Sequence, residues 1–78
     1  MASSCHLTHT DPGRNMARYY RMTIQPTLFG EWSLVREWGR IGQGGQVKAT
    51  PYQTSTEAEA ALVAISLKKE RRGYMRHS

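Results

Sequence analysis

The chain has 78 residues and one cysteine, Cys5, so it has room for one small domain and for no intramolecular disulfide. Its longest apolar run, residues 60–65, is too short for a membrane-spanning helix, which needs about 20 residues. The formal net charge of +5 favours a polyanionic partner, although a basic surface that only keeps a protein soluble has the same composition.

Residues 1–15 are rich in Ser, Thr, Asp, Pro and Gly, and Leu7 is their only good core residue. This composition predicts a disordered tail over residues 1–15 and a folded domain over residues 16–78. The cluster Cys5-His6-Leu7-Thr8-His9 offers metal ligands, but it lies in the predicted tail without a fourth ligand, so we expect no metal site. The lack of an apolar h-region and of a second cysteine indicates a cytoplasmic protein, with nucleoid association left open.

Three stretches alternate apolar and polar residues with the two-residue period of half-buried strands. They cover residues 17–24, 31–40 and 46–52. Proline and glycine in the first connection indicate a hairpin. In the third strand we expect Val47 and Ala49 to face inward, and Lys48 and Thr50 to face outward.

The second predicted strand carries Trp38-Gly39-Arg40 and leads into a glycine-rich segment, residues 42–45. Glycine inside a strand often marks a bulge, which shifts the parity of the residues after it. The sequence therefore leaves open whether Trp38 and Arg40 share a face. The glycine-rich segment lacks the Lys-Ser/Thr ending of a phosphate loop and no helix begins directly after it, so we interpret it as a tight turn.

Residues 57–72 are predicted as one helix. Thr56 and Glu59 fit a capping box at its start, and Gly73 fits the position after its end. Acidic residues stand in its first turn and basic residues in its last, which complements the helix dipole. Residues 74–75 are expected to add a short final strand or a packed tail.

Two apolar stripes have helical spacing on roughly opposite sides of this helix. The stripe expected to cover the sheet consists of Ala58, Ala61, Leu62 and Ile65. The second stripe, with Val63 and Leu67, either is simply exposed or forms a surface for a partner protein or a second copy. The predicted fold class is α+β, a small antiparallel sheet of three to four strands with one helix packed across one face.

The ionisable residues do not support catalysis. The six carboxylates are scattered among basic residues or lie in the predicted tail, and the three histidines, His6, His9 and His77, lie near the termini. No nucleophile–base pair can be assembled from these residues. We therefore expect no enzymatic activity, no cofactor and no small-molecule substrate.

Trp38 and Arg40 carry the case for a binding function. A tryptophan at a strand end can anchor a core, but Trp32 can fill that role and leave Trp38 exposed. An exposed indole stacks on a base or a sugar, and a neighbouring guanidinium pairs with phosphate oxygens through two N–H donors. These residue types in a basic domain favour nucleic acid as the partner.

The order of several motifs along the chain is similar to that of a known family. The residues concerned are Tyr19-Tyr20, Trp32, Trp38-Gly39-Arg40-Ile41-Gly42, Gly45-Gln46, Ala58, Ala61, Lys69 and Gly73-Tyr74. In this arrangement the chain resembles the WGR domain over about residues 17–74. WGR domains occur in DNA-dependent poly(ADP-ribose) polymerases and as bacterial modules. The resemblance implies a small antiparallel sheet with a helix across one face, here as a stand-alone module.

In the polymerases, the WGR domain binds broken DNA ends near the 5′ terminus. The motif's tryptophan stacks on the terminal sugar, and its arginine takes part in phosphate or interdomain contacts. The resemblance implies these roles for Trp38 and Arg40. Nothing in the chain resembles the polymerases' catalytic domain, so ADP-ribosyl transfer is not implied.

We therefore expect a module that binds nucleic acid, with DNA ends or breaks as the target. The expected nucleic-acid-binding residues are Trp38, Gly39, Arg40, Arg36, Lys48 and Gln43. The alternative is a protein–protein interaction or self-association module that uses the same motif together with Val63 and Leu67 on the outer helix face. No membrane partner is expected.

Overall fold

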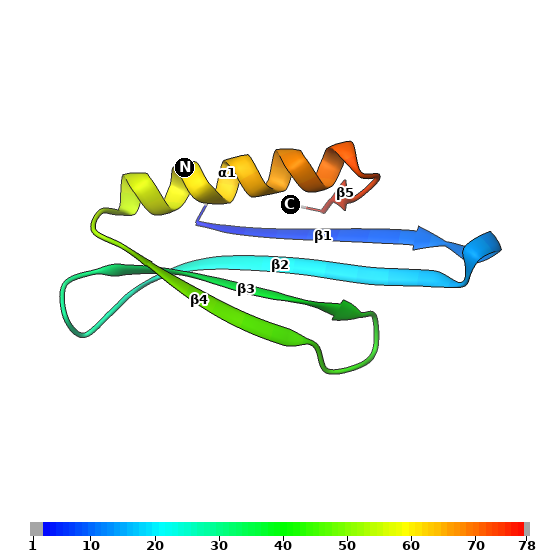
Figure 1. Cartoon of the computed structure of the whole chain (residues 1–78), viewed down its shortest axis with the longest axis horizontal. Coiled ribbons are helices and arrows are strands. Elements are labelled where there is room, and N and C mark those ends of the chain that lie inside the picture. The colour runs from blue at the N-terminus through cyan, green and yellow to red at the C-terminus, as the bar shows by residue number, and fades with distance from the viewer. Residues whose placement is uncertain (1–2, 78) are drawn as a thin grey trace.

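A computed structural model describes residues 3–77 of the chain. Its elements, in chain order, are strand β1 (Ser4–Asp11), 3-10 helix η1 (Pro12–Arg14), β2 (Met16–Pro26), β3 (Trp32–Arg40), β4 (Gln46–Tyr52), helix α1 (Ser55–Arg71) and β5 (Met75–Arg76). The strands form one antiparallel sheet in the order β4-β3-β2-β1-β5, and α1 packs against it (Figure 1). The predicted α+β class is confirmed, with five strands in place of three or four.

The prediction of a disordered N-terminal tail is wrong where the structure describes it, because β1 lies inside the sheet between β2 and β5. β1 pairs with β2 over eight residues, from Ser4 opposite Thr23 to Asp11 opposite Met16. Cys5 and Leu7 are almost fully buried. This segment is polar on its outward positions and is stabilised by pairing with a distant strand, which local composition does not reveal. Residues 1–2 of the predicted tail, and residue 78 of the predicted domain, lie outside the described part of the chain.

The pairing of β2 with β3 runs without interruption from Pro26 opposite Trp32 to Arg18 opposite Arg40. No bulge forms at Gly39, which pairs directly with Tyr19. Because side chains alternate strictly between the two faces of a regular strand, Trp38 and Arg40 share one face of the sheet. The question that the sequence left open is therefore settled by register.

β4 has the opposite orientation to the predicted one. Lys48 pairs with Arg36 and Thr50 pairs with Leu34, so these β4 residues share the sheet face that carries the buried Leu34. Val47 lies on the other face and is 64% exposed. A shift of one residue in register exchanges the two faces of a strand, and the register of β4 is set by β3 rather than by its own weak pattern.

Helix α1 begins at Ser55, two residues earlier than predicted. The capping box is formed by Thr54 and Glu57 instead of Thr56 and Glu59: the Thr54 Oγ1 accepts from the Glu57 N–H at 3.1 Å, and the Glu57 Oε1 accepts from the Thr54 N–H at 3.1 Å. Both residue pairs fit the same sequence pattern. The structure uses the earlier pair, so that only Gln53 and Thr54 connect the end of β4 at Tyr52 to the start of α1.

The core lies between α1 and the sheet. Its members are Cys5, Leu7, Tyr20, Met22, Leu34 and Leu62. The inward helix stripe is confirmed, since Ala58 and Leu62 are buried and Ala61 and Ile65 are partly buried. Val63 and Leu67 face outward and are 47% and 49% exposed. Among residues 3–77, no helix has both the length and the apolar character needed to cross a bilayer.

The molecule is elongated, with principal extents of 45 × 23 × 16 Å. Figure 1 shows the β2–β3 connection and the first turn of α1 at one end. The β1–β2 and β3–β4 connections lie toward the other end, as does the last turn of α1. The end with the β2–β3 connection carries acidic side chains, whereas the end with the last turn of α1 carries basic side chains.

Candidate nucleic-acid interface

Trp38 is held by a stacked neighbour on the adjacent strand. It lies directly opposite Tyr20, and the two rings are nearly parallel, with centroids 5.8 Å apart and an interplanar angle of 16°. Trp38 is half-buried and packs against the core cluster. The indole thus combines both roles that the sequence offered for it, because one part supports the core and the remainder is open to a partner.

A pocket of about 360 Å³ opens beside Trp38, where the ends of β2 and β3 meet the last turns of α1. Its lining consists of Arg18, Tyr19, Tyr20, Trp38, Gly39, Arg40, Lys69 and Tyr74. Three of these side chains are cationic and none is a carboxylate. A concave site with aromatic walls and unopposed positive charge has the chemistry that binds a base or sugar together with a phosphate.

Lys69 extends over the aromatic floor of the pocket. Its Nζ lies 4.6 Å from the centroid of the Tyr20 ring and 5.7 Å from that of Tyr74. Partial burial lowers the pKa of Lys69 from its usual value, and the neighbouring charges of Arg72, Lys68 and Arg36 lower it further. An anion in the pocket would reverse this effect, because it favours the charged ammonium.

Arg40 is anchored to the β1–β2 connection. Its Nη1 donates to the main-chain oxygen of Asn15 and its Nη2 donates to Asn15 Oδ1, both at 3.2 Å. Arg40 also lies directly opposite Arg18, so two positive side chains face each other across β2 and β3. Like charges in direct opposition destabilise a sheet, and a bound anion would relieve that repulsion.

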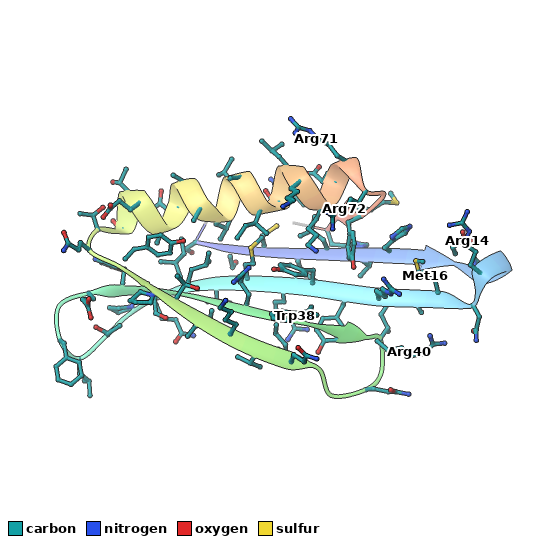
Figure 2. The ribbon with its side chains drawn as sticks, viewed as in Figure 1. Arg14, Met16, Trp38, Arg40, Arg71 and Arg72 are labelled. Carbon is teal, nitrogen blue, oxygen red and sulfur yellow. The ribbon has the colours of Figure 1, made fainter. Side chains whose placement is uncertain are left out.

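More positive charge surrounds this end of the molecule. Figure 2 shows Arg14 near the β1–β2 connection, on the same side of the molecule as Arg40, and Arg71 and Arg72 at the last turn of α1. Arg71 points away from the sheet in this view, whereas Arg72 lies nearer to it. The pocket therefore lies within a wider basic region.

Comparison with known proteins assigns the chain to a family. The model of the WGR domain matches residues 3–78 of the chain. The chain belongs to the WGR domain family. The resemblance inferred from the Trp-Gly-Arg stretch is thereby confirmed, and the match begins at residue 3, so it includes β1. WGR domains are modules known from nucleic-acid-binding proteins.

One relative is "Uncharacterized protein y4dW" of Sinorhizobium fredii (strain NBRC 101917 / NGR234), which is 42% identical over 69 residues. The similarity covers 88% of this chain and 34% of that protein, so the chain spans about a third of the relative's length. No solved structure matches the chain significantly.

The WGR domain's pocket unites only some of the residues that the sequence predicted for the site. Trp38, Gly39 and Arg40 line it, whereas Arg36, Lys48 and Gln43 do not. Gln43 lies in the β3–β4 turn, where its N–H donates to the Arg40 carbonyl at 3.1 Å. Gln43 is thus close in sequence to the pocket without contributing to its lining.

Arg36 and Lys48 lie opposite each other further along the sheet, two residues from Trp38 and Gln46 in the register. The Arg36 Nη1 donates to the Tyr20 hydroxyl at 3.4 Å, while its buried Nε has no hydrogen-bond partner. Arg36 therefore lies beside Tyr20 on the same face of the sheet and adds positive charge near the pocket. Lys48 is exposed on β4 and lies outside the pocket lining.

The structure also adds residues that sequence reasoning did not assign to the site. Arg18, Tyr20, Lys69 and Tyr74 come from β2, α1 and the segment after it. Their sequence signals are the shared parity of Arg18 and Tyr20, the basic helix end, and the presence of Tyr20, Lys69 and Tyr74 among the residues of the WGR resemblance. None of these signals indicates that the helix end lies over this part of the sheet, because that proximity arises only in the tertiary fold.

The cysteine and histidines of β1 do not converge on a metal. Successive side chains of a strand point to opposite faces, so Cys5 and His9 are separated from His6. Within residues 3–77, no three His, Cys, Asp or Glu side chains are grouped to hold a metal ion. Burial raises the pKa of the Cys5 thiol, which keeps it protonated at neutral pH.

Proposed function

We propose that this WGR domain binds nucleic acid through the pocket beside Trp38, with DNA ends or breaks as its preferred target and without catalysis of its own. The observation that carries the proposal is the pocket lining, in which aromatic rings and three cationic side chains occur without a carboxylate. In this role the protein acts in the cytoplasm, in contact with the nucleoid.

Stacking gives a reason for a preference for ends. Inside a duplex, both faces of each base are covered by neighbouring bases, so the face of an indole has nothing to stack on. A terminal nucleotide exposes one base face and its sugar, which Trp38 can cover, and its phosphate can pair with the guanidinium of Arg40 or Arg18. Lys69 adds a third positive charge to the same pocket.

Fluorescence anisotropy with labelled DNA tests the proposal. Blunt duplexes with 5′-phosphates are compared with closed hairpins and single strands, at low and at physiological salt. We expect the strongest binding to the ended duplex, a steep decrease in affinity with salt, and loss of the preference for ends in Trp38→Ala and Arg40→Ala. Arg21→Ala is the matched control, because Arg21 carries the same charge but pairs with Glu37 on the opposite face, at 3.8 Å.

The controls define the outcomes. Equal binding to every polyanion, unchanged by Trp38→Ala, would mean that the protein binds polyanions through general positive charge and not through the pocket. Absence of binding at low salt refutes nucleic-acid binding altogether. Equal losses in Arg21→Ala and Arg40→Ala place the effect in net charge rather than in the pocket.

A second candidate is a protein-interaction surface on the outer face of α1. Val63 and Leu67 are each about half exposed there, on a helix whose other side covers the sheet. Sedimentation at several concentrations tests it. Association that disappears in Leu67→Glu supports this surface, and a strictly monomeric protein argues against self-association through it.

A further inference from the structure

The most exposed apolar side chains of the described residues lie at the tip of the β2–β3 connection. Leu28 is 98% exposed and Phe29 is 88% exposed. We call these two residues the apolar tip. Isolated apolar residues are common on protein surfaces, but two large neighbours that both project into water are a candidate contact site.

The apolar tip is held in place by its own turn. The Thr27 N–H donates to the Glu31 carbonyl at 2.8 Å, and Thr27 Oγ1 accepts from the N–H groups of Phe29 and Glu31, at 3.3 and 3.2 Å. Gly30 comes directly after the tip with a φ of +82°, a conformation that favours glycine. A turn with this many internal hydrogen bonds is already ordered before binding, which lowers the entropic penalty of association.

The surroundings of the apolar tip differ in charge from the pocket. Residues 24–34 and 50–60, which form this end of the molecule, include Glu31, Glu57 and Glu59 but no lysine or arginine. This end therefore attracts nucleic acid and anionic lipid surfaces less than the basic end does. A partner for the apolar tip should present an apolar or aromatic cavity with positive charge around it.

The other end of the same molecule has a cavity of that kind. The pocket beside Trp38 has aromatic walls from Tyr20, Trp38 and Tyr74, and it carries Arg18, Arg40 and Lys69. Its volume is about 360 Å³. An engineered protein cavity of about 150 Å³ already holds a benzene molecule, so the pocket has room for a phenyl ring and part of a second side chain.

We propose that the apolar tip of one copy docks into the pocket of a second copy, so that the chains associate head to tail. Phe29 enters among the aromatic rings, where the ammonium of Lys69 contacts its face, and Glu31 approaches the guanidinium groups of Arg18 and Arg40. Because the two surfaces are different, each added copy leaves one tip and one pocket free.

This association uses the pocket that we propose for nucleic acid, so the two ligands compete. That competition rests on the proposed function, whereas the docking of the apolar tip does not. A nucleic-acid end would release a copy from its neighbour, and a released pocket would become available for nucleic acid.

Sedimentation velocity over a concentration series tests the docking. We expect the weight-average sedimentation coefficient of the unaltered chain to rise with concentration. The double variant Leu28→Ser/Phe29→Ser should lower the association constant by about tenfold or more, since two exposed apolar side chains no longer become buried. Val47→Ser is the matched control, because it removes an exposed apolar residue from β4 and should leave association unchanged.

Mixing of two variants makes the test specific. The tip variant Leu28→Ser/Phe29→Ser keeps its pocket, and Trp38→Ala keeps its apolar tip, so each alone should be monomeric. An equimolar mixture should form a one-to-one heterodimer, because one intact tip can meet one intact pocket. Absence of the heterodimer overturns the proposal, provided that circular dichroism shows both variants to be folded.

The remaining outcomes separate this proposal from the others. A chain that stays monomeric at millimolar concentration, or whose association survives the tip variant, overturns the docking. Loss of association in Leu67→Glu but not in the tip variant assigns the contact to the outer face of α1. The tip variant should bind DNA at least as tightly as the unaltered chain, because its pocket is intact and no neighbouring tip competes for it. Failure of both the unaltered chain and the tip variant to bind DNA refutes only the proposed function. If a duplex binds without dissociating the assembly, the proposal that the apolar tip and nucleic acid use the same pocket is wrong.

Discussion

Gly39 and Gly45 lie so close together that a Cβ atom on Gly39 would meet the Gly45 Cα at 2.8 Å. The Tyr19 ring covers the same place, with its Cε1 3.5 Å from that Cβ position. The glycine of the Trp-Gly-Arg motif therefore makes room for the β3–β4 turn to close against β3 and for Tyr19 to cover both glycines. This packing explains why Tyr19 is 8% exposed although it lies on the face without the helix.

Gly45→Ala should strongly destabilise the domain. A Cβ on Gly45 would overlap the Trp38 carbonyl oxygen and lie 2.5 Å from the Tyr19 hydroxyl. Overpacking of this kind costs about 1–3 kcal/mol, and each kcal/mol lowers the melting temperature of a small domain by about 4–8 °C. Thermal unfolding followed by circular dichroism measures the change. Gly44→Ala is the matched control, because its Cβ would meet nothing within 4 Å; equal destabilisation by both variants would contradict the proposed close packing.

Thr54→Ala should destabilise the domain by about 1 kcal/mol, because it removes the side chain that caps α1. Thr56→Ala should have a much smaller effect, since Thr56 lies inside the helix as an exposed residue. Urea unfolding of both variants separates the two capping boxes that the sequence allows. A larger loss of stability in Thr56→Ala than in Thr54→Ala would indicate that the helix begins at the later position that the sequence predicts.

Cys5 should react slowly with a thiol reagent in the folded protein. It is 2% exposed, and burial raises the pKa of its thiol, although the charge of Arg76 opposes the increase. We expect the reaction at pH 8 to be at least about tenfold slower than in denaturant, because the thiol becomes accessible only when β1 opens. Equal rates in both conditions would indicate that β1 is not stably paired with β2.

Lys69 should lose its proton at a lower pH in the folded protein than in the unfolded chain, because burial and the nearby Arg72 lower its pKa. The unfolded chain then binds more protons between the lowered pKa and 10.5, so the free energy of unfolding should increase as pH rises through this range. A phosphate-bearing ligand should raise the Lys69 pKa again. NMR titration of the lysine side chain, with and without a 5′-phosphorylated duplex, measures both effects.

The Lys69→Met variant provides the control for this pH dependence. It retains a long apolar side chain and has no group to titrate, so its share of the alkaline increase in stability should disappear. An unchanged pH profile would assign the increase to another group. A Lys69 pKa that the duplex does not shift would indicate that the phosphate lies away from the pocket.

The sequence by itself determined the family, the α+β class, the positions of three of the strands and the inward stripe of α1. These features have strong local signals: alternating side chains in β2, helical spacing from Ala58 to Ile65, and the Trp-Gly-Arg stretch with glycines directly after it. Each of them can be recognised within one short segment, because periodicity and turn chemistry depend on near neighbours.

Only the tertiary structure decided which residues form the site and which segments join the sheet. β1 is too polar to be recognised alone, and its stability comes from pairing with β2. The orientation of β4 is set by its register with β3, and the pocket arises because the end of α1 brings Lys69 over Tyr20. These contacts join residues far apart in the chain, and their geometry depends on packing and register, which no local pattern of residues contains.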